Sequence, residues 1–343
     1  MTLDLSGLKN YLGTGRGIID VHSHALLPVW LSAVSTLTGL PADKVMIAGT
    51  PVPKWSVDAH LAMMDANGIA ACVLSWPGAT SFLKGKPARD LARAMNEEFA
   101  NIVSRHPTRF GAFAVAPTDD MEACIEEMAY ALDVLKLDGV ATGTHIGGVY
   151  LGDPCFDRWF DEMNRRKATL FIHPMPPPGA EHVGMTINPA ILEFMFDSTR
   201  MATNMVLSGA KKRYADVKMI CTHGGGTIPY LASRISLLAP VFGAGPDRPR
   251  LTAEEVLEGL SSFYFDLTAS TASTPLAAMH RFVPSSHLML GFDFPMMPAE
   301  TVPTVWKMFE TDPELTADDR HRIVQGTALG LLPNLARQIE SGT

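Results

Sequence analysis

The sequence predicts an α/β fold, a (β/α)8 TIM barrel with an insertion after the first strand. Short apolar runs rich in β-forming residues alternate with longer segments of helical periodicity, and eight such strand candidates occur along the chain. Several runs, such as AACVLS at 70–75, are apolar at odd and even positions alike, as expected for strands buried on both faces of a parallel sheet. The length of 343 residues suits a barrel with insertions, which needs ~250 residues or more.

The predicted strands are Ile18–His24, Ile69–Ser75, Phe110–Ala116, Gly139–Thr144, Thr169–His173, Lys218–Thr222, Phe263–Leu267 and His287–Phe292. Helices are expected between them, at Asp58–Ala66, Pro87–Arg105 and Phe156–Lys167, and near 119–135, 189–209, 228–238, 252–260, 299–310 and 316–338. Each helix prediction follows from apolar residues that recur at helical spacing on one face. A large doubly wound sheet would also fit this alternation, but no GxGxxG follows the first strand, so a dinucleotide fold loses its main support.

Two loops interrupt this regular pattern. Residues 25–55 contain several prolines and glycines and no clear element, so we expect an insertion that could act as a lid. Residues 240–250 form a second loop rich in Pro and Gly. No domain boundary is evident, and residues 1–343 are therefore predicted to form a single barrel domain.

Composition excludes several classes of protein. The net charge is −8 and no block of Lys and Arg stands out, which gives no sign of a nucleic-acid-binding surface. No run of ~18 apolar residues occurs, so a membrane span is not expected. The four cysteines form no CxxC pair, and the N-terminus does not resemble a secretory signal. These features predict a cytoplasmic protein with free thiols.

Histidines lie where predicted strands end. His22 and His24 close the first strand, and strand alternation places residues two apart on the same side. Since barrel active sites form at the carboxyl ends of the strands, both imidazoles could bind one divalent metal ion. A pair of hydrogen-bonded histidines at a strand edge is the alternative.

Two further histidines follow the same rule. His173 ends the fifth strand just before Pro174, and beside the first pair it is a candidate third ligand, although a lone histidine after an apolar strand is usually structural. His223 ends the sixth strand and precedes three glycines, which would let the backbone approach a ligand closely. A phosphate-binding loop is the rival interpretation, but it lacks the Lys-Ser/Thr of a P-loop.

Asp293 follows the eighth strand and is flanked by Phe292, Phe294 and Pro295. A carboxylate in apolar surroundings should be paired or bound to a metal, because burying it uncompensated is costly. Such surroundings also raise a carboxyl pKa, so Asp293 could carry a proton during catalysis.

Taken together, these features resemble the amidohydrolase superfamily, in which HxH after strand one, His after strands five and six and Asp after strand eight form the metal site. Within it, the chain is similar to the branch of 2-amino-3-carboxymuconate-6-semialdehyde decarboxylase. The stretches that carry the resemblance are GTH at 143–145, the segment 150–174, THGGGTIPYLASRI at 222–235 and GFDFP at 291–295. The segment 150–174 (YLGDPCFDRWFDEMNRRKATLFIHP) looks especially like 6-methylsalicylate decarboxylases.

The resemblance implies a ligand set of His22, His24, His173 and Asp293 for one divalent metal ion, zinc in the first place and manganese as the alternative. It makes His223 the catalytic histidine near a metal-bound water, with Asp293 as the second catalytic residue. Arg234 matches an arginine that family members insert into a neighbouring subunit's site, which implies a homodimer or a higher homo-oligomer.

The chain also departs from the family pattern. No lysine follows strand four, where binuclear members bridge two metals, so a single metal is expected. Phe292 stands where Ser is common and would reshape the pocket. The nearest cation before the second helix is Lys54, where the carboxymuconate enzyme has an arginine, which favours a monocarboxylate aromatic substrate.

The expected activity is non-oxidative decarboxylation of a small hydroxylated aromatic acid of the salicylate type, or of a related unsaturated carboxylic acid. Arg234, His145, Trp76 and Phe292 are candidate substrate-binding residues. A metal-dependent hydrolase of a lactone, an amide or a carbon–carbon bond could use the same mononuclear site. A non-catalytic metal-binding or small-molecule-binding protein is the third possibility.

Overall fold

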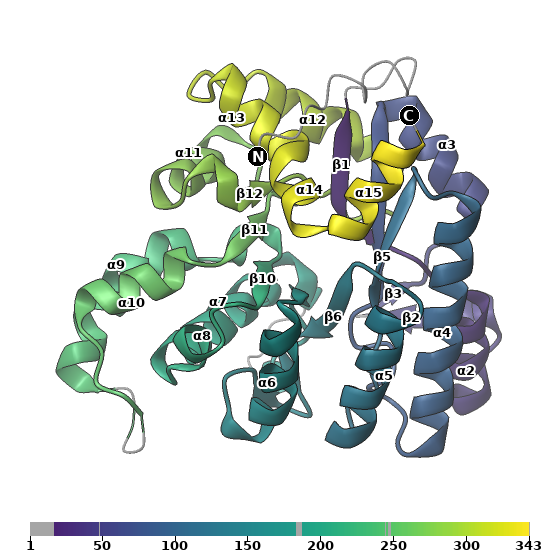
Figure 1. Cartoon of the computed structure of the whole chain (residues 1–343), viewed down its shortest axis with the longest axis horizontal. Coiled ribbons are helices and arrows are strands. Elements are labelled where there is room, and N and C mark those ends of the chain that lie inside the picture. The colour runs from purple at the N-terminus through teal and green to yellow at the C-terminus, as the bar shows by residue number, and fades with distance from the viewer. Residues whose placement is uncertain (1–16, 48, 183–186, 244, 246–247, 343) are drawn as a thin grey trace.

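The computed structural model describes residues 17–47, 49–182, 187–243, 245 and 248–342. Eight parallel strands form one sheet in the order β1-β4-β5-β6-β9-β10-β11-β12, so each strand pairs with the next one along the chain (Figure 1). Their bounds are β1 (Ile18–His24), β4 (Ile69–Ser75), β5 (Phe110–Ala114), β6 (Gly139–Gly143), β9 (Thr169–His173), β10 (Lys218–Cys221), β11 (Tyr264–Asp266) and β12 (Leu288–Met289).

The sheet closes on itself through the segment that follows β12. Isolated parallel bridges pair Asp20 with Leu290 and Ser23 with Phe294. The amide of His24 donates to the carbonyl of Phe294 at 2.7 Å. The predicted TIM barrel is therefore confirmed. The strand predicted at His287–Phe292 is shorter than expected, because residues 290–294 leave β11 and pair with β1.

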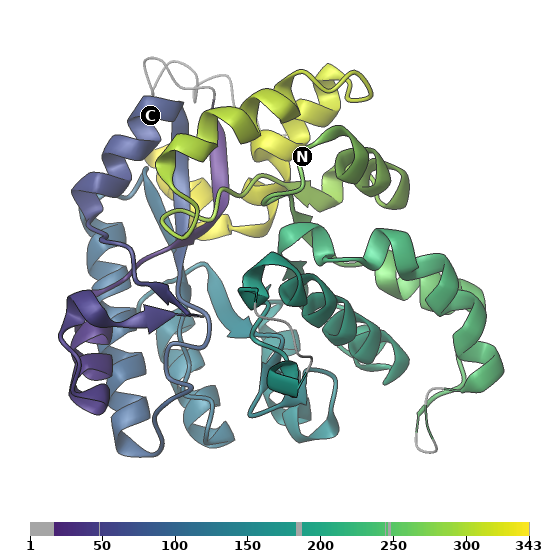
Figure 2. The same ribbon diagram turned by 180° about the vertical axis from the view of Figure 1, so that it is seen from behind.

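Helices surround the barrel (Figure 2): α3 (Val57–Asn67), α4 (Lys86–Arg105), α5 (Met121–Asp133), α6 (Asp157–Arg166), α7 (Glu193–Leu207), α8 (Ala210–Arg213), α9 (Ile228–Phe242), α10 (Ala253–Ser261), α11 (Ser273–Phe282) and α12 (Val302–Glu310). The sequence missed α11. The helix expected at 316–338 is divided into α13 (Ala317–His321), a π-helical turn at Arg322–Gly326, α14 (Thr327–Leu331) and α15 (Pro333–Ser341). Pro333 begins α15, a position where its missing amide hydrogen is harmless.

The segment after β1 is more regular than the sequence suggested. It holds α2 (Pro28–Thr38), a 3-10 turn at Ala42–Lys44 and a hairpin of β2 (Met46–Ile47) and β3 (Thr50–Pro51). The prediction of no clear element there was wrong, since Pro28 begins α2 and Gly39 ends it with a φ of 68°. Helix α2 lies beside α4 (Figures 1 and 2). Its action as a lid stays a prediction.

Two apolar clusters make up the core. One fills the space between the strands and the outer helices. The other fills the barrel interior and includes Phe113 and Phe171, whose rings stack, together with Leu332 and Leu335 from the C-terminal segment. Helices α14 and α15 thus cover the amino ends of the strands (Figure 1). Because these helices close the amino ends, a functional site in the barrel must open at the carboxyl ends of the strands. None of the described helices is long and apolar enough to cross a membrane.

Candidate metal centre

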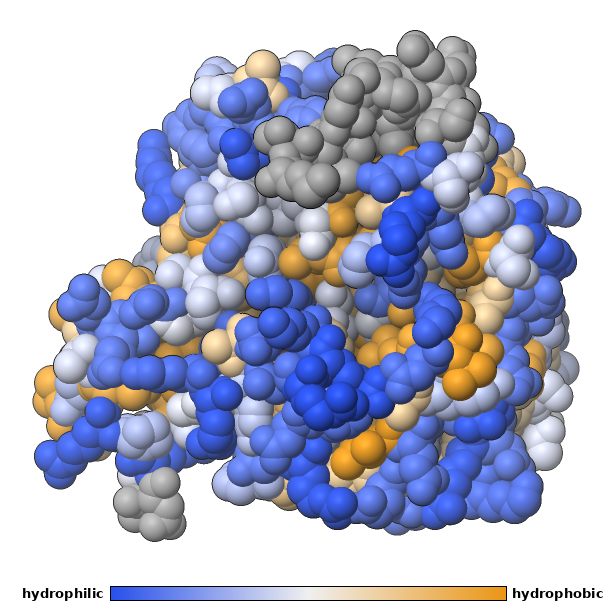
Figure 3. Space-filling view, viewed as in Figure 1, coloured by the Kyte–Doolittle hydropathy of each residue, from blue (hydrophilic) through white to orange (hydrophobic). Residues whose placement is uncertain are grey.

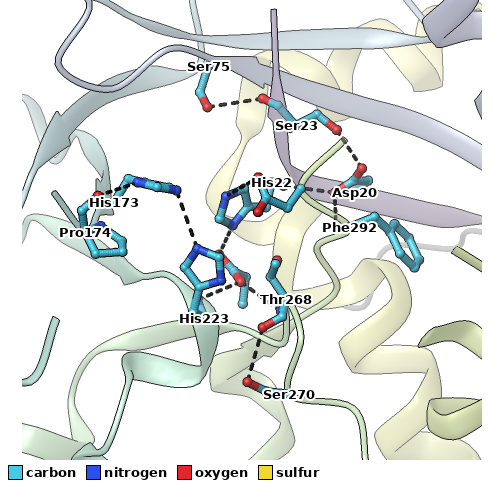
Figure 4. Close-up of polar contacts among 12 residues, drawn as sticks. Asp20, His22, Ser23, Ser75, His173, Pro174, His223, Thr268, Ser270 and Phe292 are labelled. Carbon is cyan, nitrogen blue, oxygen red and sulfur yellow. Dashed lines mark hydrogen bonds and ion pairs between the residues drawn. The ribbon is translucent and has the colours of Figure 1, made fainter. Parts of the chain in front are cut away.

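Four side chains from three distant parts of the sequence meet at the carboxyl ends of the strands. His22 and His24 come from the end of β1, His173 is the last residue of β9, and Asp293 follows β12. One candidate ligand atom from each lies within 4.8 Å of the others. Figure 4 shows the rings of His22, His173 and His223 facing one another.

Two of the imidazoles turn the same nitrogen toward the centre of this group. Nδ1 of His22 lies 3.0 Å from Oδ2 of Asp266, and Nδ1 of His173 lies 2.7 Å from the carbonyl of Pro174. Both partners can accept a hydrogen bond but not donate one, so Nδ1 must carry the proton in each ring. In the neutral form of each ring, Nε2 is then the nitrogen with a free lone pair, which is the tautomer that a metal ligand requires.

The third imidazole, that of His24, is also protonated at Nδ1, and its partner there is the hydroxyl group of Ser75. Ser75 donates its one proton to the carbonyl of Ser23 at 3.1 Å. Its oxygen lies 3.1 Å from Nδ1 of His24 and can therefore take part there only as the acceptor. His24 thus also presents Nε2, which lies 3.0 Å from Oδ1 of Asp293.

The residues present fit a divalent cation. Nε2 of His22 is buried and makes no hydrogen bond within the part of the chain that the structure describes. A buried polar atom without a partner is uncommon and is explained by an ion at this position. Three imidazole nitrogens and one carboxylate oxygen are a ligand set suited to zinc and similar divalent metals.

The electrostatics around Asp293 set the charge of this carboxyl group in the free site. Burial by itself raises the pKa of this carboxyl group, as the sequence suggested. The positive charges of His22 and His24 outweigh burial, so the pKa of Asp293 lies well below its usual range. Conversely, burial lowers the pKa of His22, but the charges of Asp266 and Asp293 raise it to about 9. Asp293 is therefore an anion in the free site.

His223 lies beside this group and not within it. Its Nε2 is 3.5 Å from Nε2 of His173, and its backbone amide donates to Oδ1 of Asp266 at 3.1 Å. Burial, and then the charge of His22, lower the pKa of His223 to about 4. Its imidazole is thus neutral near pH 7 and can accept or donate a proton in a reaction.

The backbone is bent sharply at two of these residues. His223 and Asp293 have φ values of 53° and 59°, in the left-handed region that non-glycine residues seldom adopt. Such outliers gather at functional sites, where the surroundings hold them in place.

The three glycines after His223 allow a sharp turn of the chain. All three have positive φ. A Cβ added to Gly225 would lie 2.5 Å from the Phe265 ring, and one added to Gly226 would meet the carbonyl of Met195. The space beside Gly225 and Gly226 is filled by packed protein atoms, and the glycines allow the chain to turn there. The approach of this backbone to a ligand stays a prediction.

Two predicted substrate-binding residues are buried near the centre. Trp76 packs edge-on against His24, with ring centroids 5.5 Å apart, and can wall the site beside that ligand. Phe292 is buried, and its amide donates to Asp20 at 3.1 Å. Figure 4 shows its ring directed away from the imidazoles, so its side chain packs in the core instead of lining the metal group.

The other two lie farther out. His145 is in β7 (His145–Ile146), which pairs with β8 (Val149–Tyr150), and its Nε2 lies 3.1 Å from the carbonyl of Pro176. Arg234 is exposed on α9 and makes no ion pair with any residue that the structure describes.

Sequence reasoning missed the buried residues that hold this site in place. Asp266 binds His22 and His223, as described above. Asp20 accepts hydrogen bonds from the amides of His22 and Phe292, at 3.0 and 3.1 Å, and so ties β1 to the segment that carries Asp293. Each is an acidic residue within an apolar strand, and that contrast is the signal that could have identified them.

Asp197 on α7 is a third buried acid of this kind. Its carboxylate accepts hydrogen bonds from the hydroxyls of Thr144 and Tyr150 and from the amide of Met175, the last at 3.0 Å. Asp197 therefore joins α7 to the end of β6, to β8 and to the loop that begins at His173.

A family model described as "Amidohydrolase" matches residues 19–333. The chain is 34% identical to the decarboxylase yanB of Aspergillus niger, over 92% of this chain and 87% of that protein. It is 30% identical to the 6-methylsalicylic acid decarboxylase of Penicillium expansum, over 92% of this chain and 96% of that protein.

Solved structures share the fold. The dihydroxybenzoic acid decarboxylase of Polaromonas sp., solved with bound manganese and the inhibitor 2-nitroresorcinol, superimposes with a TM-score of 0.76 at 18% identity, over 92% of this chain and 97% of that one. The match of the family model over nearly the whole described chain, with relatives of 30% identity and more, shows that this protein belongs to the amidohydrolase family.

Proposed function

We propose that this protein is a metal-dependent, non-oxidative decarboxylase of a small hydroxylated aromatic acid of the salicylate type. The observation that carries the proposal is the group of three Nε2 atoms and one carboxylate at the mouth of the barrel. It occurs in a chain that matches two proteins named as decarboxylases over 87% and 96% of their lengths.

His22, His24, His173 and Asp293 would hold the metal. When bound, a divalent cation supplies positive charge that orients a carboxylate with its neighbouring hydroxyl group and offsets their charge. The three imidazoles need no rearrangement for this, because their Nδ1 atoms are already occupied.

Asp293 would transfer the proton to the ring carbon that carries the carboxylate. Because its pKa is low, Asp293 must first take this proton from the substrate hydroxyl or from solvent. Its oxygen lies among the imidazoles, close to where a bound acid would react. His223, which is neutral near pH 7, would donate a hydrogen bond to the substrate or handle a water beside it. Trp76 would wall the pocket next to His24.

Zinc is the metal we propose, with manganese as the alternative. The ligand set suits zinc, because imidazole is a good ligand for it and one carboxylate completes four positions. Carboxylate ligation also suits manganese, which the structure of the dihydroxybenzoic acid decarboxylase contains.

We further propose that the protein is a homodimer or a larger homo-oligomer built through α9. Leu237, Val241 and Phe242 are 62%, 73% and 79% exposed on this helix, together with Arg234. Figure 3 shows hydrophobic residues at the outer edge of the molecule, over α9 and α10. An apolar patch of this kind is typical of a protein interface, and Arg234 could then reach a neighbouring subunit's site.

Residues 1–343 would form a single domain, with the segment 25–55 as a lid over the site. Residence in the cytoplasm is a further proposal, made from composition.

The experiment that tests the activity is incubation of zinc- or manganese-loaded protein with a panel of hydroxybenzoates and carboxylated muconates and, separately, with lactones and amides. Release of CO₂ from an ortho-hydroxybenzoate, with one solvent deuteron incorporated at the vacated ring carbon in D₂O, supports the proposal. Consumption of lactone or amide substrates with incorporation of oxygen from H₂¹⁸O, and without CO₂, would establish the hydrolase alternative instead. Tight metal binding with no turnover of any substrate would favour a binding protein.

A further inference from the structure

A second cavity lies at the opposite end of the barrel from the metal centre. Its volume is about 310 Å³. It is lined by residues from α8 and α10 and by the residues at the amino ends of β10, β11 and β12, among them Lys218, Tyr264 and His287. Because the metal group lies at the carboxyl ends of these strands, the two sites are on opposite faces of the barrel.

Lys211 is the unusual residue in this cavity. Its side chain lines the cavity although the residue is 7% exposed. Its ammonium group makes no hydrogen bond or ion pair with any residue in the described ranges. Its nitrogen lies over the ring of Phe263, 5.0 Å from the ring centroid.

Its neighbour Lys212 shows the ordinary arrangement. The side chain of Lys212 is 79% exposed and lies 3.2 Å from Glu255 at the rim of the same cavity. Two glutamates line the cavity, and this ion pair neutralises Glu255. The other, Glu258, is exposed. The cavity therefore has three lysines against two glutamates, and its buried lysine has no carboxylate partner.

A buried ammonium without a counterion is costly, and such groups are normally paired. Burial lowers the pKa of Lys211 to about 8; the charge of Lys218 acts in the same direction, and Cys221 opposes it. Near pH 7 the ammonium group is thus still mostly charged, and an anion bound in the cavity would serve as its counterion.

We propose that this cavity is a binding site for a small oxyanion, with the ammonium groups of Lys211 and Lys218 as its contacts. The space is larger than an inorganic anion needs, since small-molecule pockets begin at about 300 Å³. The rings of Tyr264 and His287, with centroids 4.7 Å apart, form a wall against which a flat organic group can pack. The site takes either an inorganic phosphate or the carboxylate of a small aromatic acid. This inference does not depend on the activity proposed for the metal centre.

The test measures the melting temperature of the metal-loaded, full-length protein during titration with sodium phosphate and, separately, sodium benzoate. Sodium chloride at equal ionic strength is the reference. We expect a saturable rise for at least one oxyanion. In Lys211→Met the half-saturating concentration should increase at least tenfold, because the central charge is gone while the side chain keeps its length.

Lys212→Met is the matched control. It removes a positive charge from the rim of the same cavity, but Glu255 already neutralises that charge. It should bind nearly as the wild type does. Lys218→Met provides a second variant should Lys211→Met fold poorly, and it should weaken binding several-fold. Benzoate bound at the metal centre would raise the melting temperature of all variants by the same amount. The difference between variants therefore measures binding in the cavity.

A tighter response to benzoate identifies an aromatic acid as the preferred occupant, and a tighter response to phosphate an inorganic anion. Equal saturable curves for the wild type, Lys211→Met and Lys218→Met would overturn the proposal. So would a wild-type response no larger than that to chloride.

Discussion

At the scale of single residues, the metal centre depends on atoms that never touch the metal. Asp266, Pro174 and Ser75 each occupy the Nδ1 atom of one histidine and leave Nε2 for the ion. Two of these partners are fixed acceptors, but Ser75 acts through a hydroxyl whose proton goes elsewhere. Of the three ligand histidines, His24 is therefore the one whose tautomer depends most on a single side-chain hydroxyl.

Asp293→Asn separates the charge of this side chain from its shape. We expect turnover to fall by three orders of magnitude or more, because an amide cannot transfer the proton, while the melting temperature changes by a few degrees at most. Initial rates of CO₂ release and a thermal melt measure the two effects. Activity near that of the wild type would rule out the role of Asp293 as proton donor.

Ser75→Ala removes the acceptor at Nδ1 of His24 and leaves the ring free to change tautomer. Loss of such an outer partner typically weakens metal binding 10–100-fold, and we expect a change of about that size. Competition with a chromogenic chelator measures the dissociation constant. His24→Ala should strip the metal in the same assay and by elemental analysis, whereas Ser104→Ala, an exposed change on α4, should have no effect. An unchanged constant in Ser75→Ala would show that Ser75 does not orient the ligand.

At the scale of secondary-structure elements, α7 is the helix that holds one wall of the site. Asp197 reaches from α7 to Thr144 after β6, to Tyr150 in β8 and to Met175 after β9, the strand that ends at the candidate ligand His173. Burial, and then Asp197, raise the pKa of Tyr150, so this hydroxyl remains a donor across the working range of pH. His173 stands two residues before Met175, and its position depends on this link.

Asp197→Ala should release the loop after β9 and leave three donors without this acceptor, of which Thr144 is buried and Tyr150 and Met175 are partly exposed. We expect a loss of about 1–3 kcal/mol in the free energy of unfolding, mainly from the buried Thr144 hydroxyl, because water can reach the other two donors. Metal affinity should also fall. Asp197→Asn keeps one acceptor oxygen, and Tyr150 can accept from the new amide, so its effects should be smaller. Urea unfolding and chelator competition measure both quantities. Phe196→Ala, one residue earlier and 37% exposed, is the control. Wild-type metal affinity in Asp197→Ala would contradict the link to His173.

At the scale of the whole molecule, the barrel is closed by contacts between distant parts of the chain. Residues 290–294 close the sheet against β1, and α15 covers its amino end. Asp138 ties α15 to β5, because its carboxylate accepts from the amide of Ala112 in β5 at 3.1 Å and from that of Leu335 in α15 at 2.9 Å.

This carboxylate makes stability depend on pH. Burial raises the pKa of Asp138 from 3.8 to about 6. The folded-state pKa lies above the unfolded one, so the contribution of Asp138 to stability is complete below about pH 4 and is lost as pH rises through about 6. The advantage of the wild type over Asp138→Asn should therefore fall by about 2–3 kcal/mol between pH 4 and pH 7, since one pKa unit is ~1.4 kcal/mol. Urea unfolding at each pH measures it, and a constant difference would contradict the assignment.

Assembly through α9 predicts that Leu237→Glu produces monomers. Two copies of the helix would then bring buried like charges together, whereas the isolated subunit loses nothing, because Leu237 is 62% exposed. Light scattering after gel filtration measures the mass. Arg234→Ala should keep the oligomer and reduce activity, if Arg234 serves a neighbouring site. A wild-type protein that is monomeric at all concentrations would refute the proposed interface.

Local patterns were enough to predict most of the elements. Apolar runs and helical spacing located all eight strands within a few residues, because each strand is buried on both faces and leaves a clear signal. They missed α11, and they missed α2 because prolines and glycines near its ends suggested a loop. They also missed Asp20, Asp197 and Asp266, since a single acidic residue does not reveal its partner.

The sequence by itself determined the barrel and the side chains that could share a metal, because periodicity and the ends of strands are local properties. The tertiary structure decided which groups face which. It placed Asp266 on Nδ1 of His22, lowered the pKa of Asp293 below the value that burial alone would give, and turned the ring of Phe292 away from the centre. Hydrogen bonds and Coulomb interactions depend on distances between residues that are remote in the chain, and folding alone sets those distances.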